Sequence, residues 1–311
     1  MQVLPEYPAP QKAPLSTTRP SNPPKGIILL LVAMTILPGM EGIAKLLLSR
    51  YPVVEVVWGR YFFHFLVLLP VVLIRYGAPA LRPRQLGVQV MRGGFLMLAT
   101  LFFISAINVM PMADALALSF ISPLVVVALS PLLLGERVGV RRWSAVAVGF
   151  CGVLVIIRPG LIELNTGALF AIASGLVYGL FTLATRRVAG SSEPLVTLVF
   201  TALVGAVALS CVMPFVWVPP TLTDVLLMAA QGMVAASGHF LIIRAYEQAP
   251  ASLLAPFTYS RIISISILAY FAFGEIPDSW TLAGVAILVA SGIYISIRER
   301  QRGAPLSAES R

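Results

Sequence analysis

Ionisable side chains that interrupt long apolar stretches are the residues of this chain whose types and spacing suggest chemistry. Glu41 and Lys45 stand four residues apart in the first apolar stretch, and Arg60 and His64 stand four apart in the second. Residues spaced in this way share one face of a helix. Charged groups inside apolar helices are costly, so they face protein or water and are candidates for binding a substrate.

Glu41 and Lys45 each have a structural interpretation beside the functional one. Glu precedes Lys in the order that favours an ion pair within one helix. Lys45 lies near the expected edge of the membrane and could extend its ammonium group to water. Glu41 lies deeper and follows Pro38-Gly39, where we expect a break in the helix that opens backbone carbonyls to a cavity. We therefore favour a functional role for Glu41.

Arg60 and His64 lead to a similar pair of alternatives. The guanidinium of Arg60 is always charged, and it suits a substrate carboxylate or phosphate, or an ion pair with Glu41 or Glu55. His64 titrates near neutral pH in water, but a single histidine in a membrane helix is more often a hydrogen-bonded packing residue.

The second half of the chain carries a matching group of polar residues. Ser260 and Ser264 share a face one turn apart, beside the helix break that Pro256 predicts, and this pattern suits either a cavity lining or helix packing. Arg261 lies on a different face and requires an acid or a substrate as its partner. Tyr259 precedes them and is a candidate for stacking on a planar ligand.

Three further residues are candidates for the same path. His239 follows Ser237-Gly238 in a late apolar stretch, and Trp58 and Tyr178 lie within apolar stretches of the two halves. Aromatic rings of this kind stack on planar ligands, although membrane proteins use them more often for packing or for anchoring at the interface.

The composition identifies the elements that position these residues. Of 311 residues, 58% are hydrophobic and only 11% are charged. A soluble domain of this size could not bury so much apolar surface, so we predict an all-α integral membrane protein. Ten stretches approach the roughly 20 residues that span a bilayer. They are 26–48, 53–75, 86–107, 112–134, 141–157, 167–185, 194–216, 222–245, 251–273 and 280–297.

The basic residues predict the orientation of these spans. With the N-terminus inside, 17 of the 22 Lys and Arg residues fall in the tails and loops of the cytoplasmic side. This bias predicts that both termini are cytoplasmic. It also accounts for the net charge of +9 without nucleic acid as a partner. Residues 1–25 have no apolar core and are expected to form a disordered tail.

Two segments of matched spacing indicate an internal repeat. Residues 111–136 and 250–275 each begin at proline and end in Gly-Glu 25 positions later. Glu136 and Glu275 therefore fit a helix-ending turn better than a binding site. Because each copy contains five spans, the second copy must be inverted, as in many secondary transporters. The predicted units are residues 26–158 and 165–298, followed by a cytoplasmic tail at 299–311.

Three segments resemble a known family. The runs GERVGVRRWSAVAVGFCGVLVIIRPG (135–160), FGEIPDSWTLAGVAILVASGIYISIRER (273–300) and APASLLAPFTYSR (249–261) are similar to EamA-type members of the drug/metabolite transporter superfamily. The resemblance covers residues 26–300 and implies two inverted five-helix repeats, with helices one to four of each lining a central path. Lys45, the following TyrPro, VVWGRYFFHF and PFTYSR look closest to the bacterial branch that takes up S-adenosylmethionine or riboflavin.

We therefore predict a secondary transporter of a small metabolite in the bacterial inner membrane, working by alternating access. The sequence carries no phosphate-binding glycine loop, metal-ligand spacing or nucleophile motif, so we expect neither an enzyme nor a cofactor. Efflux of amino acids or toxic compounds is one alternative, and a non-transporting membrane subunit is another. Small residues in spans five and ten permit close helix contact, either within the fold or in a homodimer.

Overall fold

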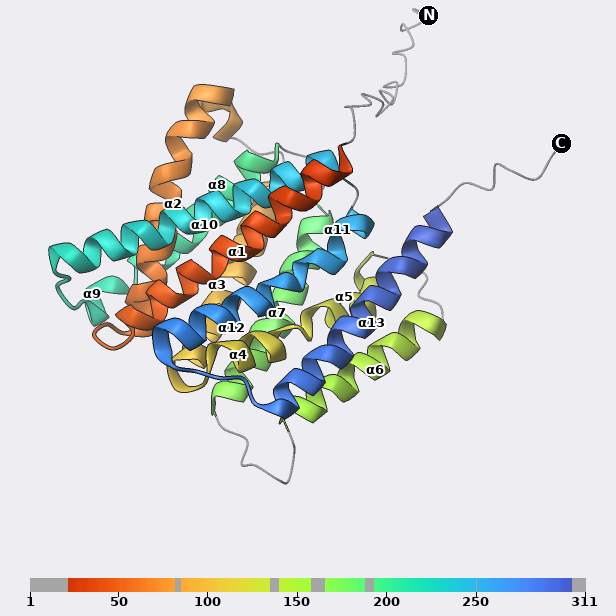
Figure 1. The fold of residues 1–311 in the computed structure, drawn as a ribbon. Helices are drawn as coiled ribbons and strands as arrows, with labels where there is room; N and C mark the ends of the chain where they lie inside the picture. The colour runs from red at the N-terminus through yellow and green to blue at the C-terminus, as the bar shows by residue number, and fades with distance from the viewer. Residues whose placement is uncertain are drawn as a thin grey trace, which may run out of the picture.

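The computed structural model describes residues 22–81, 85–134, 140–157, 166–187, 193–249 and 251–303. Within these ranges the regular secondary structure is entirely helical (Figure 1). In chain order the helices are α1 (Pro23–Leu47), α2 (Val53–Tyr76), the short 3-10 helix η1 (Ala78–Leu81), α3 (Leu86–Val109), α4 (Met112–Ser119), α5 (Ser122–Leu134), α6 (Val140–Ile157), α7 (Thr166–Arg187), α8 (Pro194–Ser210), α9 (Met213–Val216), α10 (Leu222–Gln248), α11 (Ala251–Thr258), α12 (Ser260–Phe273) and α13 (Ser279–Gly303).

Many of these helices meet the requirements for crossing a membrane. Among the described residues, six segments are long and apolar enough to span, and the segment Met112–Leu133 among them comprises α4 and most of α5. Four shorter apolar helices of 10–17 residues accompany them in α6, α8, α12 and α13. The described part of the chain is therefore all-helical, as predicted, and contains helices suited to a membrane.

Helices α1 and α13 extend into the segments predicted as tails. Helix α1 begins at Pro23, and the side chain of Asn22 accepts a hydrogen bond from the backbone N–H of Lys25 at 3.1 Å, so the helix start is capped. Residues 1–21 lie outside the described residues. At the other end, α13 continues to Gly303, within the segment predicted as a tail.

The predicted break at Pro38 is wrong, because α1 continues through it as one helix. A break occurs instead in the predicted helix 112–134, which divides into α4 and α5. Pro123 follows this break and has no N–H to donate to the carbonyl of Ser119, so the hydrogen-bond ladder is interrupted there. Gly175 of α7 packs against this point, since a Cβ at that position would lie 2.7 Å from the Ser119 carbonyl oxygen.

Two other predicted helices are also divided. The segment 251–273 forms α11 and α12, which meet at Tyr259 shortly after Pro256, and the hydroxyl of Ser260 donates to the carbonyl of Phe257 at 2.7 Å. The segment 194–216 forms α8 and the short α9, with Pro214 just inside α9. Proline removes one backbone donor in each segment, near the interruption.

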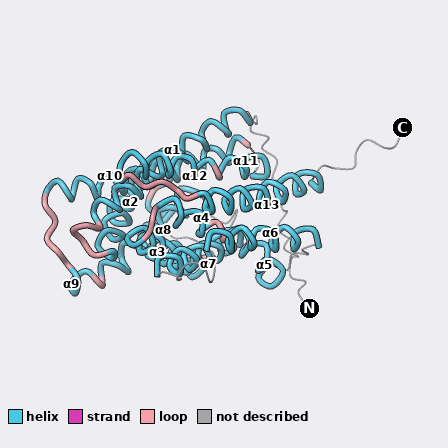
Figure 2. The backbone as a smooth tube through the Cα atoms, turned by 60° about the horizontal axis from the view of Figure 1, so that its bottom comes forward, coloured by secondary structure: helices cyan, strands magenta, loops and turns pink. Residues whose placement is uncertain are grey.

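The helices pack in an arrangement that brings the two ends of the sequence together. Helix α1 lies along α10 and α12, α3 lies along α7 and α8, and α2 lies along α8 and α10. Figure 1 shows α1 and α10 side by side, with the start of α1 and the end of α13 at the same end of the bundle. Figure 2 shows the loops gathered mainly between the ends of the helices.

Helices α6 and α13 form a closely packed pair at one edge of the bundle (Figure 1). A Cβ on Gly152 would lie 2.9 Å from the carbonyl oxygen of Gly284, so the two backbones approach too closely for larger side chains. A Cβ on Gly149 would lie 3.3 Å from the hydroxyl of Ser291. These small residues therefore serve packing within the fold.

Candidate functional site

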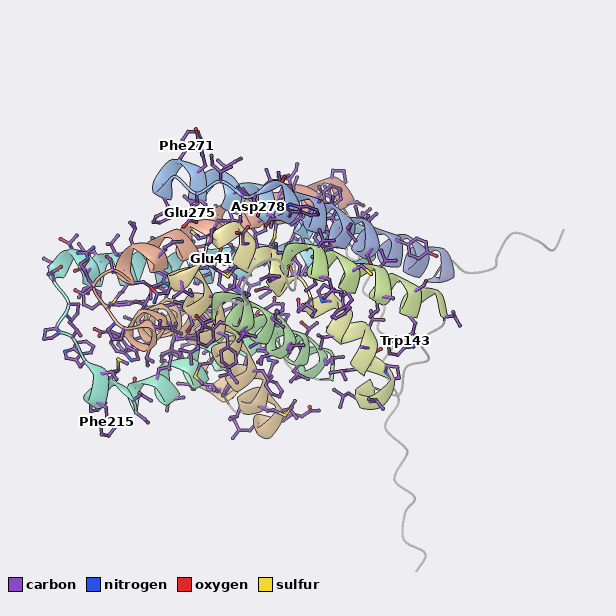
Figure 3. The ribbon with its side chains drawn as sticks, turned by 90° about the horizontal axis from the view of Figure 1, so that it is seen from below. Glu41, Trp143, Phe215, Phe271, Glu275 and Asp278 are labelled. Carbon is purple, nitrogen blue, oxygen red and sulfur yellow. The ribbon has the colours of Figure 1, made fainter. Side chains whose placement is uncertain are left out.

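An ion pair between Glu41 and Arg261 joins α1 to α12. Nη2 of Arg261 donates to Oε1 of Glu41, whose side chain is only 2% exposed, whereas that of Arg261 is 25% exposed. Arg261 is the second residue of α12, so the break at Tyr259 places it at this position. The structure confirms that Arg261 pairs with an acid. Figure 3 shows Glu41 lying among the helices, whereas Phe215 and Phe271 project from the periphery.

The pair leaves two polar atoms without hydrogen-bond partners. Oε2 of Glu41 and Nε of Arg261 are buried and make no hydrogen bond. Unpaired buried polar atoms cost free energy, so these atoms are suited to a ligand that would satisfy them.

Lys45 does not pair with Glu41, and the predicted ion pair within α1 is wrong. Its ammonium group instead contacts a carboxylate oxygen of Glu275 and donates to the carbonyl of Met110 at 3.3 Å. The second carboxylate oxygen of Glu275 accepts from the backbone N–H of Met112 at 3.0 Å. Lys45 is thus held by protein, and 17% of its side chain is exposed.

Glu275 follows a turn in which Gly274 adopts a φ of +70°, a conformation that favours glycine. The predicted helix-ending role of Gly-Glu is therefore confirmed here, and the ion pair with Lys45 is an additional role. Glu136 lies outside the described residues.

Arg60 points from α2 toward α3. Its Nη1 donates to Oγ1 of Thr100 at 3.0 Å, and the hydroxyl of Tyr61 lies 3.0 Å from the same oxygen. Arg60 is 6% exposed, and its Nε has no partner. Neither predicted acid reaches it, because Glu41 pairs with Arg261, and Glu55 accepts from the backbone N–H of Val218 at 3.0 Å.

The two histidines of the chain lie beside each other. The rings of His64 on α2 and His239 on α10 have centroids 5.8 Å apart. Nδ1 of His239 donates to the carbonyl of Ala235 at 2.7 Å, whereas Nε2 of His64 is buried without a partner. Gly232 permits this approach of the helices, since a Cβ there would lie 2.7 Å from the backbone nitrogen of His64.

Trp58 lies apart from these groups. Its indole N–H donates to the hydroxyl of Ser210 at 2.8 Å, and its ring stacks on Phe62 and meets the edge of Trp217. Trp58 therefore contacts the end of α8 and the segment after α9, and these contacts indicate a packing role.

The remaining predicted residues lie on α7 and around the α11–α12 break. Tyr178 is 43% exposed, and its ring lies 5.4 Å from that of Phe181 on the same helix. Tyr259 packs edge-on against Phe120, so the two breaks contact each other. Ser264 donates to the carbonyl of Ser260 at 3.4 Å, within its own helix.

The sequence matches the family described as the EamA-like transporter family over residues 24–158 and 165–297. The chain belongs to the EamA-like transporter family. The protein is therefore a multi-pass membrane transporter, and the predictions of a transporter rather than an enzyme are confirmed.

Relatives with assigned roles are similar over most of their length. The S-adenosylmethionine uptake transporter of Rickettsia bellii is 26% identical over 89% of this chain and 94% of that protein. The riboflavin transporter of Rhizobium johnstonii is 27% identical over 81% and 83%. The pseudopaline exporter of Pseudomonas aeruginosa is 28% identical over 87% and 95%. One chain from a solved crystal structure shares the fold, with a TM-score of 0.64 and 20% identity over 91% of this chain and all of that one.

Sequence reasoning missed one polar network of this EamA-type chain. The hydroxyl of Tyr51, in the loop between α1 and α2, donates to the carboxylate of Asp224 at 2.7 Å. Arg50 and Thr221 contact the same carboxylate, at 2.8 and 2.7 Å. The hydrogen bond to Asp224, together with burial, raises the pKa of the Tyr51 phenol above its ordinary value. The spacing of Thr221 and Asp224 could have indicated the start of α10, because residues three apart in this order form a helix cap.

A pocket of about 400 Å³ also went unpredicted. It lies at the ends of α2 and α10 and the start of α8, and is lined by Arg75, Tyr76, Glu193, Arg244, Glu247 and Gln248. The backbone N–H of Asn22 donates to the carbonyl of Gln248, so the start of α1 lies at this end. Glu41 is 19 residues further along α1, a distance of about 28 Å at the rise of an α-helix. The pocket is therefore remote from the Glu41–Arg261 pair.

Proposed function

We propose that the protein is a secondary transporter that carries a small metabolite across the bacterial inner membrane, and that its physiological direction is uptake. S-Adenosylmethionine is the first substrate to test, because relatives named as its uptake transporters match nearly the whole chain. Riboflavin is the second, on the same basis. Transport would proceed by alternating access between two inverted repeats of five spans each.

The helix boundaries support this repeat. Shifted by 139 residues, α4 at 112–119 coincides with α11 at 251–258. With the same shift, the end of α5 coincides with the end of α12, and the start of α6 coincides with the start of α13. Both repeats then divide their fourth span, one at Phe120 and the other at Tyr259.

The packing partners support the same correspondence. If α1, α2 and α3 correspond to α7, α8 and α10, the contact of α1 with α10 has its counterpart in that of α7 with α3. The contact of α2 with α10 likewise corresponds to that of α8 with α3, and α1 with α12 to α7 with α5. In the two remaining contacts, α2 packs against its own counterpart α8, and α6 packs against its own counterpart α13. Contacts between counterparts are expected for helices beside a two-fold axis.

The orientation follows from the basic residues. The cytoplasmic placement of both termini puts 17 of 22 Lys and Arg residues on the inner side. With this orientation, the Lys45–Glu275 ion pair lies at the outer end of the bundle, and the 400 Å³ pocket lies at the inner end.

The observation that carries the proposed path is the Glu41–Arg261 ion pair. It connects one repeat to the other at the broken helix, which is where inverted-repeat transporters bind their substrates. S-Adenosylmethionine bears cationic ammonium and sulfonium groups and a carboxylate, so it could exchange with both partners of the pair. Tyr259 and Ser260 adjoin Arg261 at the break and extend the path on this side.

Transport in membrane vesicles tests the proposal. Right-side-out and inverted vesicles containing the protein would receive isotopically labelled S-adenosylmethionine or riboflavin, with vesicles from cells lacking the protein as the control. We expect accumulation of one of these compounds above the control in right-side-out vesicles. Flux only toward the outside would indicate export, as for the pseudopaline relative, and no flux of either compound would contradict the proposed substrates.

A further inference from the structure

The buried guanidinium of Arg60 differs from two other cations in the membrane-spanning helices. Lys45 contacts Glu275 and Arg261 contacts Glu41, so each is neutralised by a carboxylate. Among the described residues, no carboxylate lies within ion-pair distance of Arg60, although only 6% of this residue is exposed. A buried charge without a counter-charge is destabilising, and structures retain it where a ligand supplies the opposite charge.

Two histidines lie close to Arg60. His64 is one turn away on α2, and the ring of His239 on α10 lies 5.8 Å from the ring of His64. Nε of Arg60 and Nε2 of His64 are buried without hydrogen-bond partners, in side chains more than nine-tenths buried. Two unsatisfied nitrogen atoms and a permanent positive charge match the acceptor oxygens of an anion.

The position of Arg60 fits a substrate site between the repeats. Its guanidinium is hydrogen-bonded to Thr100 of α3, while its helix lies along α8 and α10. Elements of both repeats therefore meet around it.

We propose that Arg60, with His64 and His239 beside it, forms a subsite for an anionic group of the substrate, either a carboxylate or a phosphate. This inference rests on the proposed transport function and names the substrate class. The substrate is then a metabolite with at least one acidic group, whose negative charge neutralises Arg60 during transport. The resulting ion pair would explain why the protein retains an unpaired arginine in its interior.

Arg92 on α3 provides a matched control. It is also a buried arginine without a carboxylate partner among the described residues, at 5% exposure. Nε of Arg92, like that of Arg60, has no hydrogen-bond partner. The other guanidinium nitrogens of Arg92, however, donate to the hydroxyls of Thr201 and Thr185 and to the carbonyl of Thr197, so α8 and α7 hold it, whereas Arg60 has one acceptor, Thr100. We assign Arg92 to packing and Arg60 to ligand binding.

Paired ligands test the assignment on the purified protein. S-Adenosylmethionine and its decarboxylated analogue form the carboxylate pair, and riboflavin 5′-phosphate and riboflavin form the phosphate pair. We expect the wild type to bind the acidic member of at least one pair about tenfold more tightly or better. Arg60→Met should abolish the preference, Arg60→Lys should retain part of it, and Arg92→Met should retain it in full.

The stability of the ligand-free variants gives a second readout. Arg60→Met removes an uncompensated charge, so its melting temperature should equal or exceed that of the wild type, whereas Arg92→Met should lower it. The subsite would be overturned if the preference for the acidic ligand survives Arg60→Met, or if the wild type binds both members of each pair equally well. It would also be overturned if the Arg60→Met protein is destabilised or misfolded. If no compound binds, the proposed substrates fail, and the melting temperatures still decide the role of Arg60.

Discussion

Separate removal of the two partners of the Glu41–Arg261 pair should have unequal effects on stability. Arg261→Met leaves the Glu41 carboxylate buried, with 2% of its side chain exposed. The expected loss is about 3 kcal/mol, the lower end for breaking a buried pair. Glu41→Gln leaves an arginine whose side chain is 25% exposed and retains a hydrogen-bond acceptor, so its loss should be about 1 kcal/mol.

The double variant tests whether the stabilities of the two residues depend on each other. Glu41→Gln combined with Arg261→Met leaves no buried charge, so we expect it to be more stable than Arg261→Met alone by about 1–2 kcal/mol. Thermal unfolding in nanodiscs, followed by tryptophan fluorescence, measures these differences, and Arg261→Met should melt roughly 5–10 °C below the wild type. Ser264→Ala on the same helix serves as a control because that hydroxyl bonds only within α12. Equal losses for the two single variants, or an additive double variant, would refute the reasoning.

Three further predictions concern other contacts. Tyr51→Phe should remove a component of stability that the wild type keeps up to about pH 10 and loses as the pH rises further toward the raised pKa of the folded phenol, because the folded state binds this proton more tightly; unfolding scans from pH 7 to 11 measure it. Gly152→Ala should lower the melting temperature by several degrees and Gly94→Ala should not, because only the first added Cβ meets a backbone oxygen, at 2.9 Å. Glu275→Gln should accelerate labelling of a cysteine introduced at Met110 by a membrane-impermeant maleimide, since it releases the lysine of α1; unchanged labelling would contradict this role.

The helical membrane architecture was predictable because hydropathy and span length dominate the energetics of a chain in a bilayer. The interruptions within helices were less predictable. Pro38, Pro70 and Pro131 remain inside continuous helices, whereas the break at Phe120–Ile121 lies beside Pro123. Neighbouring helices decide which proline interrupts a helix, and local sequence does not contain that information.

The partners of the charged residues were likewise not predictable from local sequence. Glu41 and Lys45 have the spacing of an ion pair within one helix, yet each contacts a residue more than 200 positions away. A local pair on a helix contributes only about 0.2–0.5 kcal/mol. Contacts between helices can therefore override it. The sequence identified Glu41 and Arg261 as candidates, but their contact depends on how α1 and α12 pack.

Counterflow into proteoliposomes tests the central claim most directly. Liposomes containing the purified protein and unlabelled S-adenosylmethionine or riboflavin would receive the labelled compound outside, at equal pH and without a membrane potential. We expect saturable exchange of one compound by the wild type and by Ser264→Ala, with loss of at least nine-tenths of the rate in correctly folded Glu41→Gln. Exchange by Glu41→Gln at the wild-type rate would contradict a transport path through the Glu41–Arg261 pair.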